Sequence, residues 1–222
     1  MDWIAFTLSL QLSLATTVIL LFVGMAVSRS LAWHNFMGRS IVEAVVALPL
    51  VLPPTVLGYY LLVALGAGSP FGRLFQAVTG DTLAFSFSGL LLASVIYSLP
   101  FAVQPMLRAF EAIPFDLREA AWCSGLSRWY TFWRIELPLA WPGVLTAMVL
   151  SFAHTMGEFG VVLMVGGNIP GETKTISIAI YDKVESLDNT AAGTMSLVLL
   201  IFALVTISLV YMVNRRMDHR YV

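Results

Sequence analysis

Long apolar runs separated by short polar stretches dominate the hydrophobic pattern of this chain. A membrane-spanning helix needs roughly 20 mostly apolar residues. Five runs reach that length, and we expect each to cross a membrane: residues 6–28, 41–65, 83–106, 139–165 and 193–213. The pattern therefore predicts an all-α integral membrane protein in which residues 1–222 form one membrane domain.

The remaining stretches are shorter or more polar. Residues 66–81 begin with glycine and serine and are expected to form a loop. Residues 176–184 are apolar but too short to span, and they contain Asp182 and Lys183. We expect a short helix there, lying at the membrane surface or folded partly back into it.

The second apolar run contains three prolines, Pro49, Pro53 and Pro54. Each proline removes a backbone donor and kinks a helix. A membrane protein tolerates this where neighbouring helices or a water-filled cavity satisfy the freed groups. Two interpretations stay open: a merely bent helix, or a helix broken beside a translocation path.

The distribution of lysine and arginine predicts the orientation, because cytoplasmic loops are enriched in both. With five spans, one set of loops holds nine of the 12 basic residues: Arg29, Arg39, Arg108, Arg118, Arg128, Arg134, Arg215, Arg216 and Arg220. The other set holds Arg73, Lys174 and Lys183. We therefore expect the N-terminus outside, and residues 107–138 and the C-terminus in the cytoplasm.

Composition agrees with a membrane location. Hydrophobic residues make up 59% of the chain and charged residues 11%, and the mean hydropathy is +0.85. Soluble proteins are about half apolar and about a quarter charged. The net charge of −1 gives no basic surface for nucleic acid, and the single cysteine, Cys123, excludes an internal disulfide and a multi-cysteine metal site.

The polar segment 107–138 is predicted to fold as helix, turn and helix. Pro114 precedes a helix start, Gly125 permits a sharp reversal through positive φ, and Ser127 is a suitable cap for a second helix. Pro138 then begins the next span. The aromatic side chains of the second helix are expected to pack against the spans: Trp129, Tyr130 and Trp133.

Seven residues of this segment form a spaced pattern: Glu119, Ala120, Ala121, Gly125, Ile135, Leu137 and Pro138. The pattern resembles the loop shared by permeases of binding-protein-dependent ABC importers. In that family the loop is a coupling helix, which sits in a cleft of a cytoplasmic ATPase. The resemblance implies that Glu119 makes a charged contact to the ATPase, that the two alanines allow close approach, and that Gly125 makes the turn. Leu137 and Pro138 would set the start of the next span.

The resemblance also implies an assembly and a mechanism. The fold would be that of a type I importer permease in the cytoplasmic membrane, with no catalytic residues and no cofactor, since a partner ATPase binds ATP and Mg²⁺. The partners would be a second copy of the chain, two ATPase subunits, an extracytoplasmic oxyanion-binding protein and the lipid bilayer. ATP binding would move the coupling helices and open the cavity outward, and hydrolysis would reset it.

Three further stretches, residues 48–60, 154–160 and 166–175, are similar to molybdate permeases. With the coupling segment, the resemblance extends over most of residues 43–184. It implies import of molybdate. Sulfate and tungstate permeases carry related versions of these stretches, so both remain alternatives.

An oxyanion path would offer hydroxyl and amide groups and few acids, because affinity must be low enough for release. Suitable groups within the spans are Thr55, Ser98, Gln104, Ser151 and Thr155. The same side chains are equally suitable as hydrogen-bond partners between helices. Glu158 would repel an anion, so we expect it to pair, cap a helix or shape a gate. His154 is expected to be a structural histidine, and Gly157 and Gly160 to permit close helix approach.

Other classes leave the seven-residue pattern unexplained. Residues 166–175 superficially resemble a nucleotide-binding phosphate loop. That motif needs a lysine directly after its second glycine, whereas Glu172 and Thr173 separate Gly171 from Lys174, so no nucleotide site is expected there. An ion-coupled secondary transporter would favour several intramembrane ionisable groups or internal repeats, and Glu158 stands alone. A membrane enzyme would need clustered catalytic groups, whereas the histidines are scattered and predict no metal site.

Overall fold

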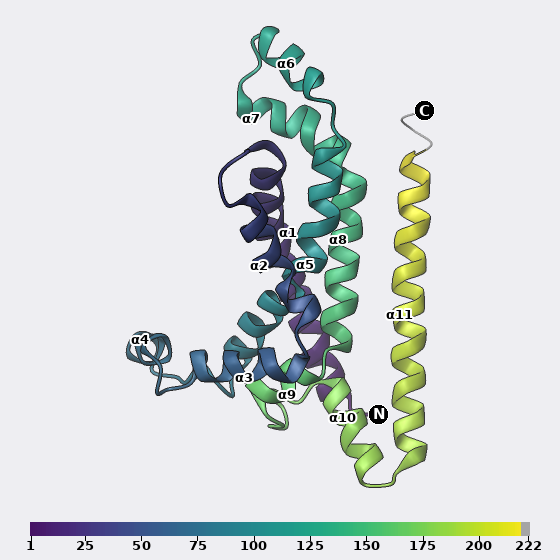
Figure 1. The fold of residues 1–222 in the computed structure, drawn as a ribbon. Coiled ribbons are helices and arrows are strands. Elements are labelled where there is room, and N and C mark those ends of the chain that lie inside the picture. Colours follow the sequence, from purple (N-terminus) through teal and green to yellow (C-terminus); the bar gives the residue numbers. More distant parts are fainter. Residues whose placement is uncertain (219–222) are drawn as a thin grey trace.

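The computed structural model describes residues 1–218, and its regular elements there are helical (Figure 1). Arg220, one of the basic residues expected in the cytoplasm, and His219, one of the three histidines, lie outside the described residues. The elements are α1 (Trp3–Trp33), α2 (Arg39–Val51), α3 (Pro54–Leu65), α4 (Pro70–Thr79), α5 (Phe87–Glu111), α6 (Phe115–Cys123), α7 (Arg128–Thr131), a π-helical turn η1 (Phe132–Glu136), α8 (Leu137–Gly157), α9 (Gly160–Gly166), α10 (Ile176–Glu185) and α11 (Asn189–Asp218).

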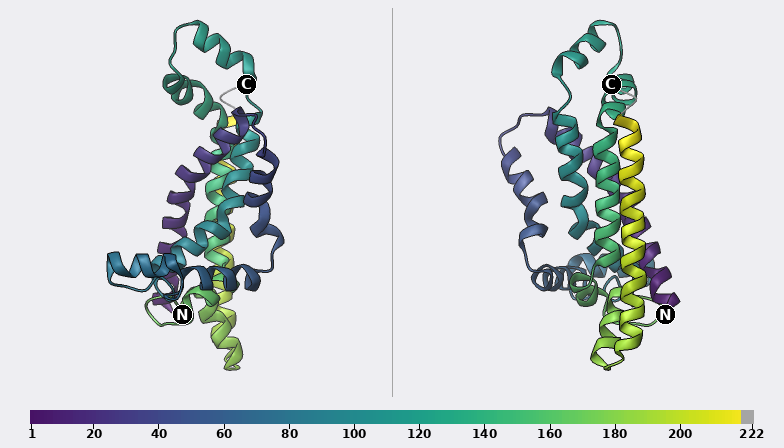
Figure 2. Two further views of the ribbon diagram at one scale, coloured as in Figure 1. Left: turned by 60° about the vertical axis from the view of Figure 1, so that its left-hand side comes forward. Right: turned by 90° about the vertical axis from the view of Figure 1, so that its right-hand side faces the viewer.

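Three long helices, α1, α5 and α8, pack together as the centre of the bundle (Figure 1). Buried apolar side chains fill the space between them, including Leu12, Leu20, Leu90, Phe110 and Val144. α11 runs along α8 and α10 at one edge (Figure 2). Among the described residues four helices are long and apolar enough to cross a membrane, and the bent pair α2–α3 makes a fifth. The prediction of about five spans is therefore confirmed.

The second predicted span is broken. α2 and α3 meet at an angle of 112°, which is a break between two helices and more than the mere bend of the first interpretation. Leu52 is extended, with φ −73° and ψ 137°, because the residue before a proline is driven out of the helical region. Pro54 then occupies the first turn of α3, where its missing N–H costs nothing.

The fourth predicted span is also interrupted, since α8 ends at Gly157 and α9 begins at Gly160. Glu158 is extended there, with φ −66° and ψ 133°, so the expected continuation of this helix to residue 165 is wrong. A Cβ on Gly160 would lie 2.7 Å from the Cβ of Pro54, which shows how closely α9 and α3 approach. The predicted role of Gly160 is confirmed, whereas a Cβ on Gly157 meets nothing within 4 Å.

The segments outside the long helices gather at the two ends of the bundle. α6 and α7 lie at one end, with the C-terminal turns of α11, and α3, α4, α9 and α10 lie at the other end with the start of α1 (Figure 1). The predicted short helix over 176–184 is confirmed as α10. α4 replaces the predicted loop, because Ser69 caps it through a 2.8 Å hydrogen bond from the N–H of Gly72, and Pro70 suits its first turn.

Candidate functional site

α6 and α7 fold as the sequence predicts, with helix starts at a proline and a serine. α6 begins directly after Pro114. α7 begins after Ser127, whose hydroxyl accepts a 3.2 Å hydrogen bond from the N–H of Tyr130. The side chain of Ser127 thereby satisfies one of the free donors at the start of the second helix.

The turn after α6 depends on Gly125, which has a φ of +83°. Its N–H donates to the carbonyl of Trp122 at 2.9 Å, and the N–H of Leu126 donates to the carbonyl of Ala121 at 3.0 Å. These two bonds define a Schellman motif, the helix ending in which glycine is strongly preferred. The chain reversal is therefore built from backbone geometry.

The residues of the seven-position pattern divide by exposure. Glu119, Ala120 and Gly125 are exposed, while Ala121 is buried and only 5% exposed. Ile135, Leu137 and Pro138 are half-buried where α8 starts. A partner can therefore reach Glu119, Ala120 and the turn, whereas Ala121 faces the inside of the loop.

The aromatic side chains of this loop do not pack against the spans as expected. Trp129, Tyr130 and Trp133 are 70%, 46% and 50% exposed, so that prediction is wrong. Phe132 takes the inward position instead and joins the core cluster that contains Phe110. The π-helical turn η1 explains the change of face, because the N–H of Leu137 bonds to the carbonyl five residues back, at Phe132.

A charged cluster that the sequence did not indicate lies at the end of the bundle that carries α6. The side chain of Glu136 is fully buried. Its Oε2 accepts a 2.6 Å hydrogen bond from Nε of Arg29, and its Oε1 accepts a 2.8 Å bond from Nε of Arg118. Both arginines also line a cavity of about 510 Å³ whose walls are mainly aromatic.

The only sequence signal for this cluster is a charged residue directly before an apolar run. Glu136 stands between Ile135 and Leu137. Its partner Arg29 is 107 residues away in the sequence, a pairing that no local pattern reveals.

A second polar cluster joins α5 to the end of α8. Ser98 Oγ lies 2.9 Å from Nδ1 of His154 and 3.0 Å from Oγ1 of Thr155. Ser94 donates a 3.0 Å hydrogen bond to Oε2 of Glu158, which is 4% exposed. The structure therefore brings together Ser98, Thr155 and Glu158 from the predicted set, and it places them as partners between helices.

The other predicted path residues lie apart from that cluster. Ser151 is fully buried, and its hydroxyl has no hydrogen-bond partner within the described chain. Thr55, at the start of α3, and Gln104, on α5, are exposed. Thr55 and Gln104 are the two polar side chains of the set that can face something outside this chain.

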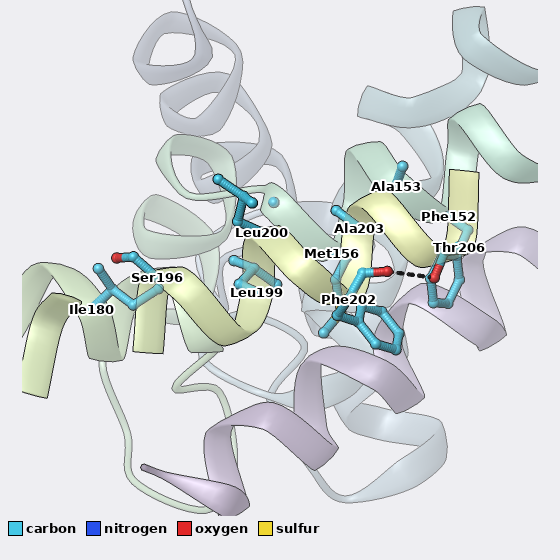
Figure 3. Close-up of a pocket in the computed structure, with 11 residues that line it drawn as sticks. Phe152, Ala153, Met156, Ile180, Ser196, Leu199, Leu200, Phe202, Ala203 and Thr206 are labelled. Carbon is cyan, nitrogen blue, oxygen red and sulfur yellow. Dashed lines mark hydrogen bonds between the residues drawn. The ribbon is translucent and has the colours of Figure 1, made fainter. Parts of the chain in front are cut away.

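A cavity of about 370 Å³ lies between α8, α10 and α11, and its lining side chains are apolar apart from two hydroxyl groups (Figure 3). Those hydroxyl groups belong to Ser196 and Thr206, and Thr206 donates to the carbonyl of Phe202 at 2.9 Å. The cavity offers no charged group, so its chemistry suits hydrocarbon and not an oxyanion. Within residues 1–218 no three His, Cys, Asp or Glu side chains gather as a metal site.

Most of the chain matches a known protein family. Residues 21–219 match the model of the binding-protein-dependent transport system inner membrane component. This chain belongs to that family. It is accordingly a multi-pass inner membrane component of a binding-protein-dependent ABC transporter, which works with an ATPase and a periplasmic binding protein and is not itself catalytic.

Relatives that match nearly all of this chain carry molybdenum or sulfate in their names. The molybdenum transport system permease protein ModB of Azotobacter vinelandii is 47% identical over 214 residues, 96% of this chain and 95% of that protein. ModB of Escherichia coli K12 is 38% identical over 94% of this chain and 90% of its own length. A probable sulfate transport system permease protein cysT of Chlorella vulgaris is 32% identical over 93% of this chain and 77% of that protein.

Solved structures share the fold of this membrane component at lower identity. A chain of a bacterial ABC transporter involved in the import of the acidic polysaccharide alginate superposes with a TM-score of 0.78 and 19% identity, covering 96% of this chain and 78% of that chain. A chain of the MetNI methionine ABC transporter in an inward-facing conformation gives 0.66 and 18%, covering 96% of both chains. The importer-type arrangement of the helices predicted from the sequence is therefore confirmed.

Proposed function

We propose that this chain is the permease subunit of an ATP-driven importer that moves molybdate across the cytoplasmic membrane. The observation that carries the proposal is the 47% identity to a molybdenum permease over nearly the full length of both chains. The sulfate relative is less similar, and this chain spans only 77% of its length. The substrate assignment therefore favours molybdate over sulfate.

Coupling to the ATPase is assigned to residues 107–138. Glu119 and Ala120 are exposed on α6, next to the turn at Gly125, so all three are accessible to a docked partner. Ile135, Leu137 and Pro138 connect this loop to α8. In this proposal the ATPase contacts α6, and α8 receives the displacement.

The proposed assembly contains two copies of this chain, two ATPase subunits and an extracytoplasmic oxyanion-binding protein. Five spans are few to enclose a path alone, which supports a second copy. The basic residues concentrate at the end that carries α6, which supports a cytoplasmic α6 and C-terminus and an N-terminus outside. The exposed Thr55 and Gln104 are the polar groups best placed to line a path shared with the second copy.

Transport would proceed by alternating access. ATP binding closes the ATPase pair, moves the coupling loops and opens the cavity to the outside, and hydrolysis to ADP and phosphate resets it. The break between α2 and α3 supports a path beside it, because its freed backbone carbonyls need polar surroundings. Glu158, buried and bonded to Ser94, is assigned to holding α8 against α5, at the point where a gate would act.

The decisive experiment is uptake of labelled molybdate into proteoliposomes that contain this chain with its ATPase and binding protein. We expect uptake that requires ATP, is blocked by tungstate and resists excess sulfate. Strong competition by sulfate would move the chain to the sulfate branch. Uptake driven by an ion gradient without ATP would contradict the proposed mechanism.

A further inference from the structure

The buried carboxylate of Glu136 ties together three segments that are far apart in the sequence. Arg29 comes from the last turns of α1, Arg118 from α6, and Glu136 from the end of η1, directly before α8. Both carboxylate oxygens are used, since Arg29 and Arg118 each donate through Nε and Arg29 adds a longer 3.4 Å contact from Nη2. One side chain therefore connects the proposed coupling helix to two spans.

Aromatic rings reinforce the connection on the side of α6. The guanidinium of Arg118 lies 3.8 Å from the ring centroid of Trp33, the last residue of α1, and 4.9 Å from that of Trp122 on its own helix. The guanidinium of Arg29 lies 5.0 Å from the ring centroid of Phe132. A guanidinium that is stacked on a ring and paired with a carboxylate is restricted in orientation, so these contacts position both arginines around Glu136.

Stability alone does not explain why these three charged side chains are brought together. Buried ion pairs often contribute little net stability, because removing the charges from water offsets their attraction. They do fix geometry, since any displacement of one partner leaves a buried charge uncompensated. α6 otherwise lies chiefly against α7 and η1, so the contacts through Arg118 are its main side-chain connection to α1.

We propose that Arg29, Arg118 and Glu136 form a rigid link that makes α6 move as one body with the cytoplasmic ends of α1 and α8. The chain itself joins α6 to α5 and α8, whereas α6 contacts the end of α1 through the ion pairs at Glu136 and the stacking of Arg118 on Trp33. Motion that the ATPase imposes on α6 is thereby transmitted to a span with no short covalent connection to the coupling loop. The three side chains are positioning residues, and they do not touch the substrate.

A distance measurement in the assembled transporter tests this link directly. Spin labels are placed on Cys123, the single cysteine, which is exposed at the end of α6, and on an exposed position of the last turn of α1 through Ser30→Cys. The labelled chain is diluted with unlabelled Cys123→Ser chain, so that distances within one chain dominate. We expect one narrow distance that is the same without nucleotide and with ATP and vanadate.

The same measurement in Glu136→Gln separates the link from mere proximity. The amide keeps the shape of the side chain but removes the charge, so we expect the distance to broaden or shift when ATP and vanadate are added. A distance that already changes between the two states in the otherwise native chain would overturn the proposal. So would a Glu136→Gln chain whose distances match the native ones in both states.

A transport readout distinguishes transmission from folding. Glu136→Gln should co-purify with the ATPase and hydrolyse ATP at close to the native rate, yet move severalfold less molybdate per ATP. The matched control is Glu43→Gln, which alters a partly exposed ion pair with Arg39 on α2 and should leave that ratio unchanged. Parallel loss of ATPase binding and hydrolysis with an unchanged ratio would show a structural role only and refute the proposal.

A second variant covers the case in which Glu136→Gln does not fold. Arg118→Lys keeps the positive charge but loses the planar group stacked on Trp33, so we expect the same defects in smaller degree, and native behaviour would contradict the link. The transport ratio rests on the proposed function, whereas the distances need the chain assembled with its ATPase, ATP and vanadate but no transported substrate. Absence of molybdate uptake by the native chain, with the distances as expected, would reject the substrate and keep the link.

Discussion

At the end of the molecule that carries α6, distant segments are joined by charged and aromatic side chains, whereas at the opposite end α3 and α9 meet through small residues. Glu136 and its two arginines bridge α1, α6 and η1 in the first case. In the second, Gly58 and Gly160 leave no room for a side chain between the helices. The end that carries α6 is therefore suited to transmit force, because its side chains connect distant segments. The other end is suited to hold α3 and α9, the second halves of two interrupted spans, in direct contact.

The largest expected effect comes from breaking the turn at the α6 end. Gly125→Pro removes the N–H donated to Trp122 and forces a φ near −65° where the chain has +83°. We expect nearly complete loss of uptake with normal membrane insertion, because only the turn is altered. Gly125→Asn is the control, since asparagine tolerates the left-handed conformation. Normal uptake by the proline variant would contradict the assignment of this loop to ATPase coupling.

A methyl group at the opposite end should lower stability more than it alters coupling. In Gly160→Ala the new Cβ would lie 2.7 Å from the Cβ of Pro54, and overpacking of this kind costs about 1–3 kcal/mol. We expect a lower Tm in thermal unfolding of the purified chain in detergent. Gly157→Ala, whose Cβ meets nothing within 4 Å, is the matched control, and equal Tm values for the two variants would argue against the tight α3–α9 contact.

A smaller effect is expected at the surface that faces the ATPase. Glu119→Ala removes an exposed carboxylate from α6, and a single exposed charge pair contributes little. We expect ATPase binding to weaken a few-fold, measured by co-purification at increasing salt, while the Tm of the isolated chain stays the same. Unchanged co-purification at every salt concentration would count against the proposed contact.

The smallest expected effect is at the start of α11. Asp188 accepts a hydrogen bond from the N–H of Ala191 at 3.1 Å and pairs with Lys183. These two interactions, the first the larger, lower the pKa of the Asp188 carboxyl. Because the folded pKa is the lower one, the added stability is present above the unfolded pKa and disappears as the pH falls through the folded one.

We therefore expect Asp188→Ala to lower the Tm slightly at neutral pH, with the difference shrinking below about pH 4. Asp188→Asn retains capping ability, so its Tm should lie between those of the native chain and Asp188→Ala. A Tm difference that does not depend on pH would show that the carboxylate charge does not contribute.

Local signals predicted the parts of the fold that depend on neighbouring residues. The long apolar runs indicated the spans, and Pro114, Gly125 and Ser127 indicated the coupling loop, because helix starts and turns are decided within a few residues. Ser69 and Pro70 carried a similar signal for α4, but the glycine and serine content around them favoured a loop.

Features that depend on distant partners were not predictable in this way. The interruption at Glu158 lies in an apolar run long enough for one continuous span, and it arises where α9 turns to pack on α3. The partners of Glu136 lie on two other elements, so composition and periodicity gave no sign of them. The inward turn of Phe132 and the exposure of Trp133 depend on one π-helical turn that no spacing rule anticipates.

That turn also sets the rotational phase between the coupling loop and its span. η1 accommodates one residue more than an α-helical turn, and Phe132 and Glu136 are both buried within it, directly before α8 begins. Successive residues of an α-helix are rotated by about 100°. Deleting a single residue from η1 would leave both helices intact yet swing α6 about the axis of α8 by roughly that angle, so the docking face would point away from its partner.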